Sequence, residues 1–115
     1  MKAQLKVTTL NVNGLRDPSK RSDIFKWFKL FSDDLIFIQD TRIRPQDISH
    51  WNQQWGSQAL WTKYTAILTN DKNMTISRIP TVPSDDRFLL AEIEGPTLGK
   101  IILASIYTLA TFTAC

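Results

Sequence analysis

Two short stretches decide the fold: LKVTTLNVNG at residues 5–14 and DLIFIQD at residues 34–40. The first combines β-branched residues with the turn sequence Asn-Val-Asn-Gly, which predicts a strand over residues 5–10 that runs into a turn. The second has four consecutive apolar residues closed by Gln39-Asp40, a pattern typical of a short strand buried on both faces. A polar and charged segment separates the two strands and has room for one helix.

That helix is predicted to begin at Asp17-Pro18, with Asp17 as the N-cap and Pro18 at the first helical position. Apolar residues recur at helical spacing between Ile24 and Phe31, and Asp33-Asp34 closes the segment. The basic residues of this segment are expected on its solvent face, namely Lys20, Arg21, Lys26 and Lys29.

A crossover helix of this length most naturally joins two parallel strands in a right-handed unit. Parallel strands end at the same edge of a sheet, so Asn11 and Asp40 are expected to emerge side by side. Ligands of open α/β sheets bind at this carboxyl edge. The sequence therefore predicts a ligand site near the ends of the first two strands.

The remaining residues are rich in strand patterns. A short helix is predicted at 45–54, strands at 64–69, 74–79, 87–94 and 100–107, and hairpin loops at 70–73 and 94–99. The tryptophans at 51, 55 and 61 could stack on bases, but core packing is the expected use, since large aromatics dominate cores. The predicted fold class is α/β, with a mixed sheet covered by one or two helices, in a single domain over 1–115.

Composition bounds the class of protein. With 115 residues, 43% hydrophobic and 22% charged, the chain is an ordinary globular domain and not a disordered, collagen-like or disulfide-rich protein. Apolar runs such as 101–104 are far shorter than the roughly 20 residues that span a bilayer, so no membrane contact is expected. Lys2 and Lys6 interrupt any secretory signal, and Cys115 is the single cysteine, which excludes an internal disulfide. The expected location is intracellular, nuclear or cytoplasmic.

The net charge of +3 is unevenly distributed. Nine basic and five acidic residues precede position 46, whereas five basic and six acidic residues follow it. A basic N-terminal third is compatible with a phosphate-rich partner such as nucleic acid, and equally with a solvated helix face. Both interpretations stay open from charge alone.

Four polar residues at predicted strand ends could carry chemistry: Asn11, Asn13, Asp40 and Tyr107. Asn and Asp supply the oxygen ligands that Mg²⁺ prefers, and a Tyr phenol can donate to a phosphate oxygen. Each has an ordinary alternative, namely a turn residue, a solvated carboxylate or a tyrosine at the rim of the core.

Taken in order, residues 9–15, the basic amphipathic helix and residues 34–42 resemble the start of the endonuclease/exonuclease/phosphatase family. The sequence is most similar to the endonuclease domains of non-LTR retrotransposons and to exonuclease III-like abasic-site nucleases. Segments 66–69, 87–93 and 101–107 look like later core strands of that family. The resemblance runs from Leu5 to about Tyr107 and covers the N-terminal half of such a domain.

The resemblance implies half of a two-sheet α/β sandwich and hydrolysis of a phosphoester, with Mg²⁺ or Mn²⁺ as cofactor and DNA as partner. Asn11 matches the family residue that helps position the phosphate, and Tyr107 matches the tyrosine that contacts the scissile phosphate; these are the candidate catalytic residues. Asp40 falls where the family has a metal-binding Glu, and Asn13 matches a position near the metal; these are the candidate metal ligands.

The chain departs from the family in two ways. Asp40 is one methylene shorter than the family's Glu, which shortens its reach toward a metal. The family's Asp-x-Asn and Ser-Asp-His segments belong to the second half of the domain, and residues 108–115 replace the expected Ala-Pro-Asn. His50 falls elsewhere in the order and is expected to be structural. A partial domain with little or no activity alone is therefore expected.

Two alternatives remain from the sequence. The chain could be a degenerate, non-catalytic module that binds nucleic acid weakly through its basic N-terminal third, or a family member acting on another phosphoester, such as a phosphoinositide or sphingolipid. A half domain is also expected to lack its second sheet, which would leave one apolar sheet face uncovered and open to self-association.

Overall fold

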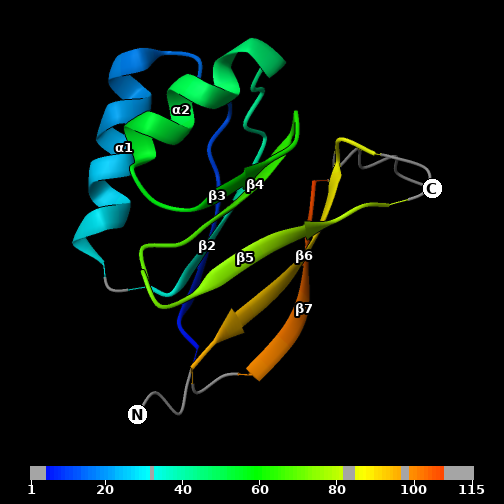
Figure 1. Ribbon diagram of the computed structural model, residues 1–115. Helices are drawn as coiled ribbons and strands as arrows, with labels where there is room; N and C mark the ends of the chain where they lie inside the picture. The colour runs from blue at the N-terminus through cyan, green and yellow to red at the C-terminus, as the bar shows by residue number, and fades with distance from the viewer. Residues whose placement is uncertain (1–4, 32, 82–84, 97–98, 108–115) are drawn as a thin grey trace, which may run out of the picture.

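The computed structural model describes residues 5–31, 33–81, 85–96 and 99–107. In chain order (Figure 1) the elements are β1 (Val7–Asn11), α1 (Pro18–Leu30), β2 (Leu35–Gln39), the 3₁₀ turn η1 (Pro45–Asp47), α2 (Ile48–Trp55), β3 (Ala59–Trp61), β4 (Thr65–Leu68), β5 (Thr75–Ile79), β6 (Phe88–Gly95) and β7 (Gly99–Ile106). The α/β class and the predicted helices are confirmed. The short strand β3 was not predicted.

The first sheet is mixed and has the strand order β1-β2-β4-β3. β1 and β2 are parallel with Asn11 opposite Gln39, so the predicted strand–helix–strand unit is confirmed. α1 begins as expected, since the Asp17 carboxylate accepts a hydrogen bond from the Ser19 N–H at 3.0 Å and Pro18 lies in the first turn.

A second sheet of order β5-β6-β7 is present, so the expectation that the second sheet would be missing is wrong. Residues 70–73 do not form a hairpin loop: β4 pairs with β2 and β3, whereas β5 pairs with β6, so this segment carries the chain from one sheet to the other. The hairpin between β6 and β7 is confirmed, with Gly95 opposite Gly99. The sequence patterns predicted these strands but could not specify which sheet each of them joins.

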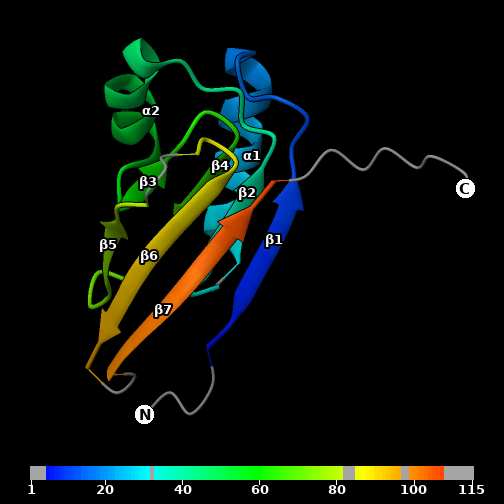
Figure 2. The same ribbon diagram turned by 90° about the vertical axis from the view of Figure 1, so that its right-hand side faces the viewer.

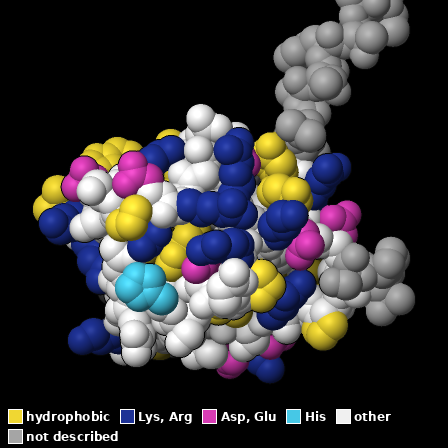
Figure 3. Space-filling model, turned by 90° about the horizontal axis from the view of Figure 1, so that it is seen from above, with side chains coloured by type: hydrophobic (Ala, Val, Ile, Leu, Met, Phe, Trp, Pro, Cys, Tyr) yellow, Lys and Arg dark blue, Asp and Glu magenta, His cyan; other side chains and the backbone are white. Residues whose placement is uncertain are grey.

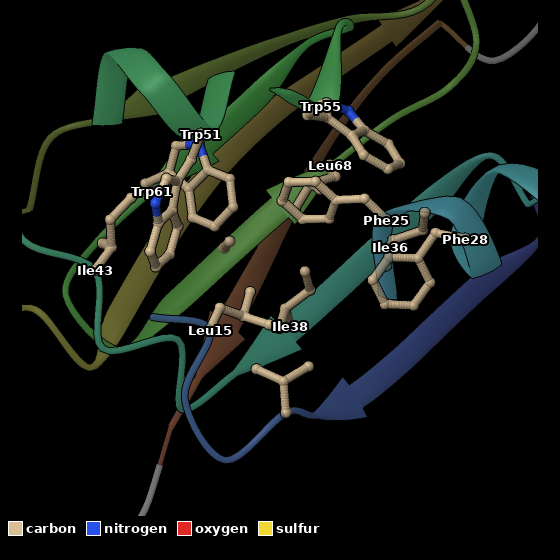
Figure 4. Packing of buried hydrophobic residues seen from close by; sticks show 12 residues of the cluster. Leu15, Phe25, Phe28, Ile36, Ile38, Ile43, Trp51, Trp55, Trp61 and Leu68 are labelled. Atoms are coloured by element: carbon tan, nitrogen blue, oxygen red, sulfur yellow. The ribbon is translucent and has the colours of Figure 1, made fainter. Parts of the chain in front are cut away.

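Two apolar layers hold the sheets and helices together. One lies between the helices and the first sheet, around Phe25, Phe28 and the three tryptophans 51, 55 and 61 (Figure 4). The other lies between the two sheets, where Leu89, Ala91 and Ile93 of β6 pack on residues of the first sheet. The tryptophans therefore serve the core, as expected, and are not exposed for base stacking. Figure 2 shows the helices on one side of the first sheet and the second sheet on the other.

Arg21 contradicts the expected solvent face of α1, because its side chain is buried. Its Nη1 donates to the Leu15 carbonyl at 2.9 Å, its Nε donates to Gln54 Oε1 at 2.6 Å, and its guanidinium lies 4.8 Å from the centroid of the Trp51 ring. Burial lowers the pKa of Arg21. Lys29 is exposed, as expected, and its Nζ bonds to the Trp55 carbonyl. Both basic residues link α1 to α2, but only Arg21 is withdrawn from the surface.

Within the described part of the chain, no helix is long and apolar enough to cross a membrane.

Replacing Trp55 with Ala tests the helix layer. Trp55 is fully buried, packs edge-on against Phe25 at 5.4 Å and donates its indole N–H to the Thr69 carbonyl at 3.2 Å. Loss of a buried aromatic of this size is expected to lower the free energy of unfolding by about 3–5 kcal/mol. Urea unfolding followed by circular dichroism measures the effect. The matched control is Trp27→Ala, since Trp27 is 44% exposed; equal losses in the two variants would contradict this packing.

Candidate functional site

Several strand ends meet at one edge of the two sheets. β1 and β2 end there, β4 begins there opposite β2, and in the second sheet β6 begins and β7 ends at the same edge (Figure 2). Beyond the strands the Gly14 N–H donates to the Asp40 carbonyl at 2.7 Å. The predicted side-by-side placement of the segments after β1 and β2 is thus confirmed.

Asn11 and Asn13 form a hydrogen-bonded turn at this edge. The Asn11 side-chain oxygen accepts from the Asn13 N–H at 3.0 Å, which is the turn role considered as its ordinary alternative. Asn13 has a φ of 52°, and its carbonyl accepts from Lys20 Nζ at 3.2 Å. Its side-chain oxygen Oδ1 accepts from Arg42 Nη2 at 3.2 Å.

Asp40 is buried, with 5% of its surface exposed, and both of its carboxylate oxygens bind Arg42. Arg42 Nε donates to Oδ1 at 2.9 Å and Nη2 donates to Oδ2 at 3.0 Å, so the pair is bidentate. The Asp40 backbone N–H donates to the Tyr64 carbonyl at 2.7 Å. The carboxylate predicted as a metal ligand is therefore held by an arginine two residues further along the chain.

Arg42 is a site residue that the sequence reasoning missed. Its side chain is half exposed, and the hydrogen bonds and charge of Asp40 raise its pKa, with Tyr107 and Tyr64 raising it further. The available signal was its position in the quoted segment 34–42, two residues after the candidate carboxylate. Arg42 is consequently a permanent cation fixed at the centre of the edge.

Backbone strain is concentrated at this edge. Among the described residues, the non-glycine residues with positive φ are Asn13 at 52°, Asp40 at 62° and Arg42 at 56°. A positive φ is unfavourable for L-residues other than glycine. Such conformations collect at functional sites, where the surrounding structure enforces them. All three residues belong to the same hydrogen-bonded cluster, which supports a functional assignment.

Tyr107 lies at the same edge and stacks on Tyr64, with ring centroids 5.5 Å apart and an interplanar angle of 26°. Its backbone N–H donates to the Arg87 carbonyl at 2.8 Å. Lys63 Nζ and the Arg87 guanidinium lie 5.3 and 5.8 Å from the centroid of the Tyr64 ring. Tyr64 was not predicted as a site residue, because nothing in its local sequence marks a stacking partner for Tyr107.

A cavity of about 380 Å³ opens beside this cluster. Its charged lining residues are Arg16, Arg44, Lys63, Arg78 and Asp86, and its apolar wall includes Trp61. Arg16 connects the cavity to the cluster, since its Nε donates to the Arg42 carbonyl at 2.9 Å. Viewed from above, Lys and Arg side chains gather on this face (Figure 3). The surface suits an anionic ligand that is larger than one phosphate.

The two predicted metal ligands, Asp40 and Asn13, do not fit a Mg²⁺ site in this arrangement. Mg²⁺ needs oxygen ligands free to coordinate it, yet both Asp40 oxygens and the Asn13 side-chain oxygen bind Arg42. The described residues contain no group of three His, Cys, Asp or Glu that could hold a metal ion. His50 is exposed on α2, where it lines a second, smaller cavity together with Arg16, Arg44 and Asp47. Residues 108–115, with Cys115, lie outside the described residues.

The fold is similar to that of the endonuclease domain of TRAS1, a telomere-specific non-LTR retrotransposon. The two share a TM-score of 0.60 and 14% sequence identity over 91% of this chain and 46% of that chain. Over 61 residues the sequence is 26% identical to the uncharacterized 149 kDa protein of transposon TX1 from Xenopus laevis, covering 53% of this chain and 5% of that protein. No family model matches. The predicted resemblance to a non-LTR retrotransposon endonuclease domain is confirmed for the fold, and the chain spans less than half of that domain.

Adding millimolar Mg²⁺ is expected to leave the melting temperature of the protein unchanged, because Arg42 occupies both Asp40 oxygens. Thermal unfolding by circular dichroism, with and without Mg²⁺, measures this, with Asp40→Ala as the control. A rise in melting temperature that Asp40→Ala abolishes would show that the metal displaces the guanidinium.

Proposed function

We propose that this chain is the N-terminal portion of an endonuclease-like domain of a retroelement, and that its carboxyl edge binds the phosphodiester backbone of DNA. The observation that carries the proposal is the cluster of Arg42, the tyrosine pair and the cation-lined cavity at one edge of this fold. Phosphate neutralisation by Lys and Arg provides most of the affinity of such surfaces. An intracellular location, nuclear or cytoplasmic, is part of the proposal.

Asn11 and Tyr107 are proposed to act on the phosphate in different ways. The Tyr107 phenol, stacked on Tyr64 at the open edge, is available to donate to a non-bridging phosphate oxygen. Asn11 acts through the backbone, because its side chain orders the turn that places Asn13 against Arg42. Asn13 is thereby a positioning residue for Arg42. Asp40, the other predicted metal ligand, also positions Arg42, through its carboxylate.

Hydrolysis by this chain alone is proposed to be slight or absent. The carboxylate within the cluster, Asp40, is paired with Arg42 and is not free to activate a water molecule. Loss of a general base typically costs about 10²–10⁴-fold in rate. Dependence on Mg²⁺ or Mn²⁺ stays a prediction drawn from the resemblance, and no step is assigned to a metal. The alternative function for the same edge is that of a phosphodiesterase acting on another phosphoester, such as a lipid headgroup.

The binding surface proposed here overlaps the basic N-terminal third only in part, through Arg16, Arg42 and Arg44. Arg21 and Lys29 are committed to the packing of α1 on α2. The cations that surround the tyrosine pair and the cavity include Lys63, Arg78 and Arg87, all from the later part of the chain. We therefore expect the affinity for DNA to depend on the cations at this edge and not on the total charge of the N-terminal third.

The triple variant Lys63→Gln/Arg78→Gln/Arg87→Gln tests this surface. Because each lost phosphate contact lowers the salt dependence by about one unit of log–log slope, the variant is expected to bind more weakly and with a flatter slope. Fluorescence anisotropy of a labelled DNA duplex and of its single strand, measured over a range of NaCl concentrations, gives both quantities. Inositol phosphates as competitors test the lipid-headgroup reading.

The matched control is Lys6→Gln/Lys72→Gln/Lys100→Gln. It removes the same charge from exposed lysines near the opposite ends of the strands, where β1 and β7 begin and the β4–β5 connection lies. Its binding is expected to change little. Equal weakening of both triple variants would mean that only net charge matters, and no binding by the unmodified chain would remove the proposed function.

Self-association is proposed through the outer face of the second sheet and not through the first sheet. Ile102 and Ile106 of β7 are 62% and 56% exposed, although both are large apolar side chains. β7 pairs only with β6 within the described chain, so its outer edge is open to a further strand.

The variant Ile102→Lys/Ile106→Lys is expected to remain monomeric at concentrations where the unmodified chain associates. Sedimentation velocity over a range of protein concentrations measures the difference. Thr75→Lys/Ser77→Lys, which adds the same charges at exposed positions of β5, serves as control. A monomeric unmodified chain, or equal dissociation of the control, would contradict self-association through β7.

A further inference from the structure

We propose that Arg42 is a built-in cation that holds a backbone phosphate at this edge, so that nucleic acid binds here without a divalent metal ion. This inference rests on the proposed function and names the group that carries it. It starts from a disagreement: the resemblance implies a metal beside Asp40, whereas the structure has a guanidinium on both oxygens of that carboxylate.

Arg42 is held more firmly than a surface arginine usually is. Its Nε and Nη2 bind the two Asp40 oxygens, and Nη2 also donates to Asn13 Oδ1. Its Cδ lies 3.4 Å from the position that a Cβ on Gly14 would occupy, so the loop passes close against its stem. The side chain therefore loses little conformational freedom when a ligand binds.

These contacts leave donors on Arg42 unused. Nε has one N–H, which binds Asp40, and the two N–H groups of Nη2 bind Asp40 and Asn13. Among the described residues, Nη1 makes no hydrogen bond that would occupy its own two N–H groups. Because the side chain is 50% exposed, those donors are accessible to a phosphate oxygen.

A metal ion and this guanidinium compete for the same oxygens. A divalent cation at Asp40 would require Arg42 to leave a bidentate pair that is supported by Asn13. Two cations sharing one buried carboxylate would also repel each other. The arrangement consequently favours a phosphate contact without a metal ion. The affinity of this contact comes from the fixed direction of the Arg42 N–H groups rather than from added net charge.

The chain contains a second arginine pair that makes a close comparison. Arg44 binds Asp47 through two hydrogen bonds of 2.8 and 3.2 Å, and its side chain is 52% exposed. Arg44 has an ordinary N-cap backbone conformation, with a φ of −96°, and among the described residues its side chain bonds to Asp47 alone. The two pairs share chemistry and exposure, and they differ in placement beside Asn13 and the tyrosines.

The test compares two double variants that leave net charge unchanged. Asp40→Asn/Arg42→Gln removes the proposed phosphate contact, and the control Glu94→Gln/Lys100→Gln removes two opposite charges from exposed cross-strand partners at the other end of the second sheet. Anisotropy of a labelled DNA oligonucleotide in EDTA is expected to show a loss of about tenfold or more for the first and at most about threefold for the second, since hydrogen bonds to charged groups are the strong ones. The unmodified chain is expected to bind equally in EDTA and in dilute Mg²⁺ at matched ionic strength.

Each contrary outcome has a separate meaning. Equal losses in the two double variants, or binding that appears only with Mg²⁺, would overturn the role of Arg42 while the edge surface could still bind. Absence of binding by the unmodified chain would instead remove the proposed function itself. Thermal unfolding checks that the variants fold; should the first double variant unfold, Arg42→Lys replaces it. That variant keeps the charge without the fork, and full affinity in it would also overturn the proposal.

Discussion

The parallel ladder of β1 and β2 continues past the ends of both strands, and the rest of the edge depends on that continuation. After Asn11 and Gln39, the N–H groups of Val12, Gly14 and Leu15 donate in turn to the carbonyls of residues 39, 40 and 41 at 2.7–3.1 Å. Two loops bound to each other in this way cannot relax independently. The left-handed backbone of Asn13 and Asp40 is imposed by this pairing, and it directs both side chains toward Arg42.

Local chemistry in the sequence was sufficient to predict the elements, and long-range packing was not. The N-cap at Asp17, the buried strand 35–38 and the strand at 87–94 are visible as short patterns, and the structure agrees with each. The division into two sheets was missed because alternation shows that a face is buried without showing against what. Arg21 was misplaced for a related reason: a periodicity argument counts arginine as polar, although a carbonyl, an amide and an indole ring together can satisfy a buried guanidinium.

The site was predictable as a place but not as a set of contacts. The parallel order of the first two strands places Asn11 and Asp40 at the same edge of the sheet, and this placement can be predicted from the sequence alone. The pairing of Asp40 with Arg42 does not, because it requires left-handed φ at both residues, which only the neighbouring loop and the Tyr64 carbonyl enforce. The Tyr64–Tyr107 stack joins residues that flank strands of different sheets, and no local pattern could have indicated it.

The connection that leaves the first sheet after β4 divides the chain into parts with different folding demands. β5, β6 and β7 follow one another as neighbours in both sequence and space, so each pairing closes only a short loop. β1 and β2 pair across the whole of α1, with Val7 opposite Leu35. Closing that longer segment costs more conformational entropy before any hydrogen bond between the two strands forms. The antiparallel meander is therefore the kinetically easy part of the molecule. The edge that carries Arg42 depends on the longer closure, so its anion site is expected to form only after β1 and β2 have paired.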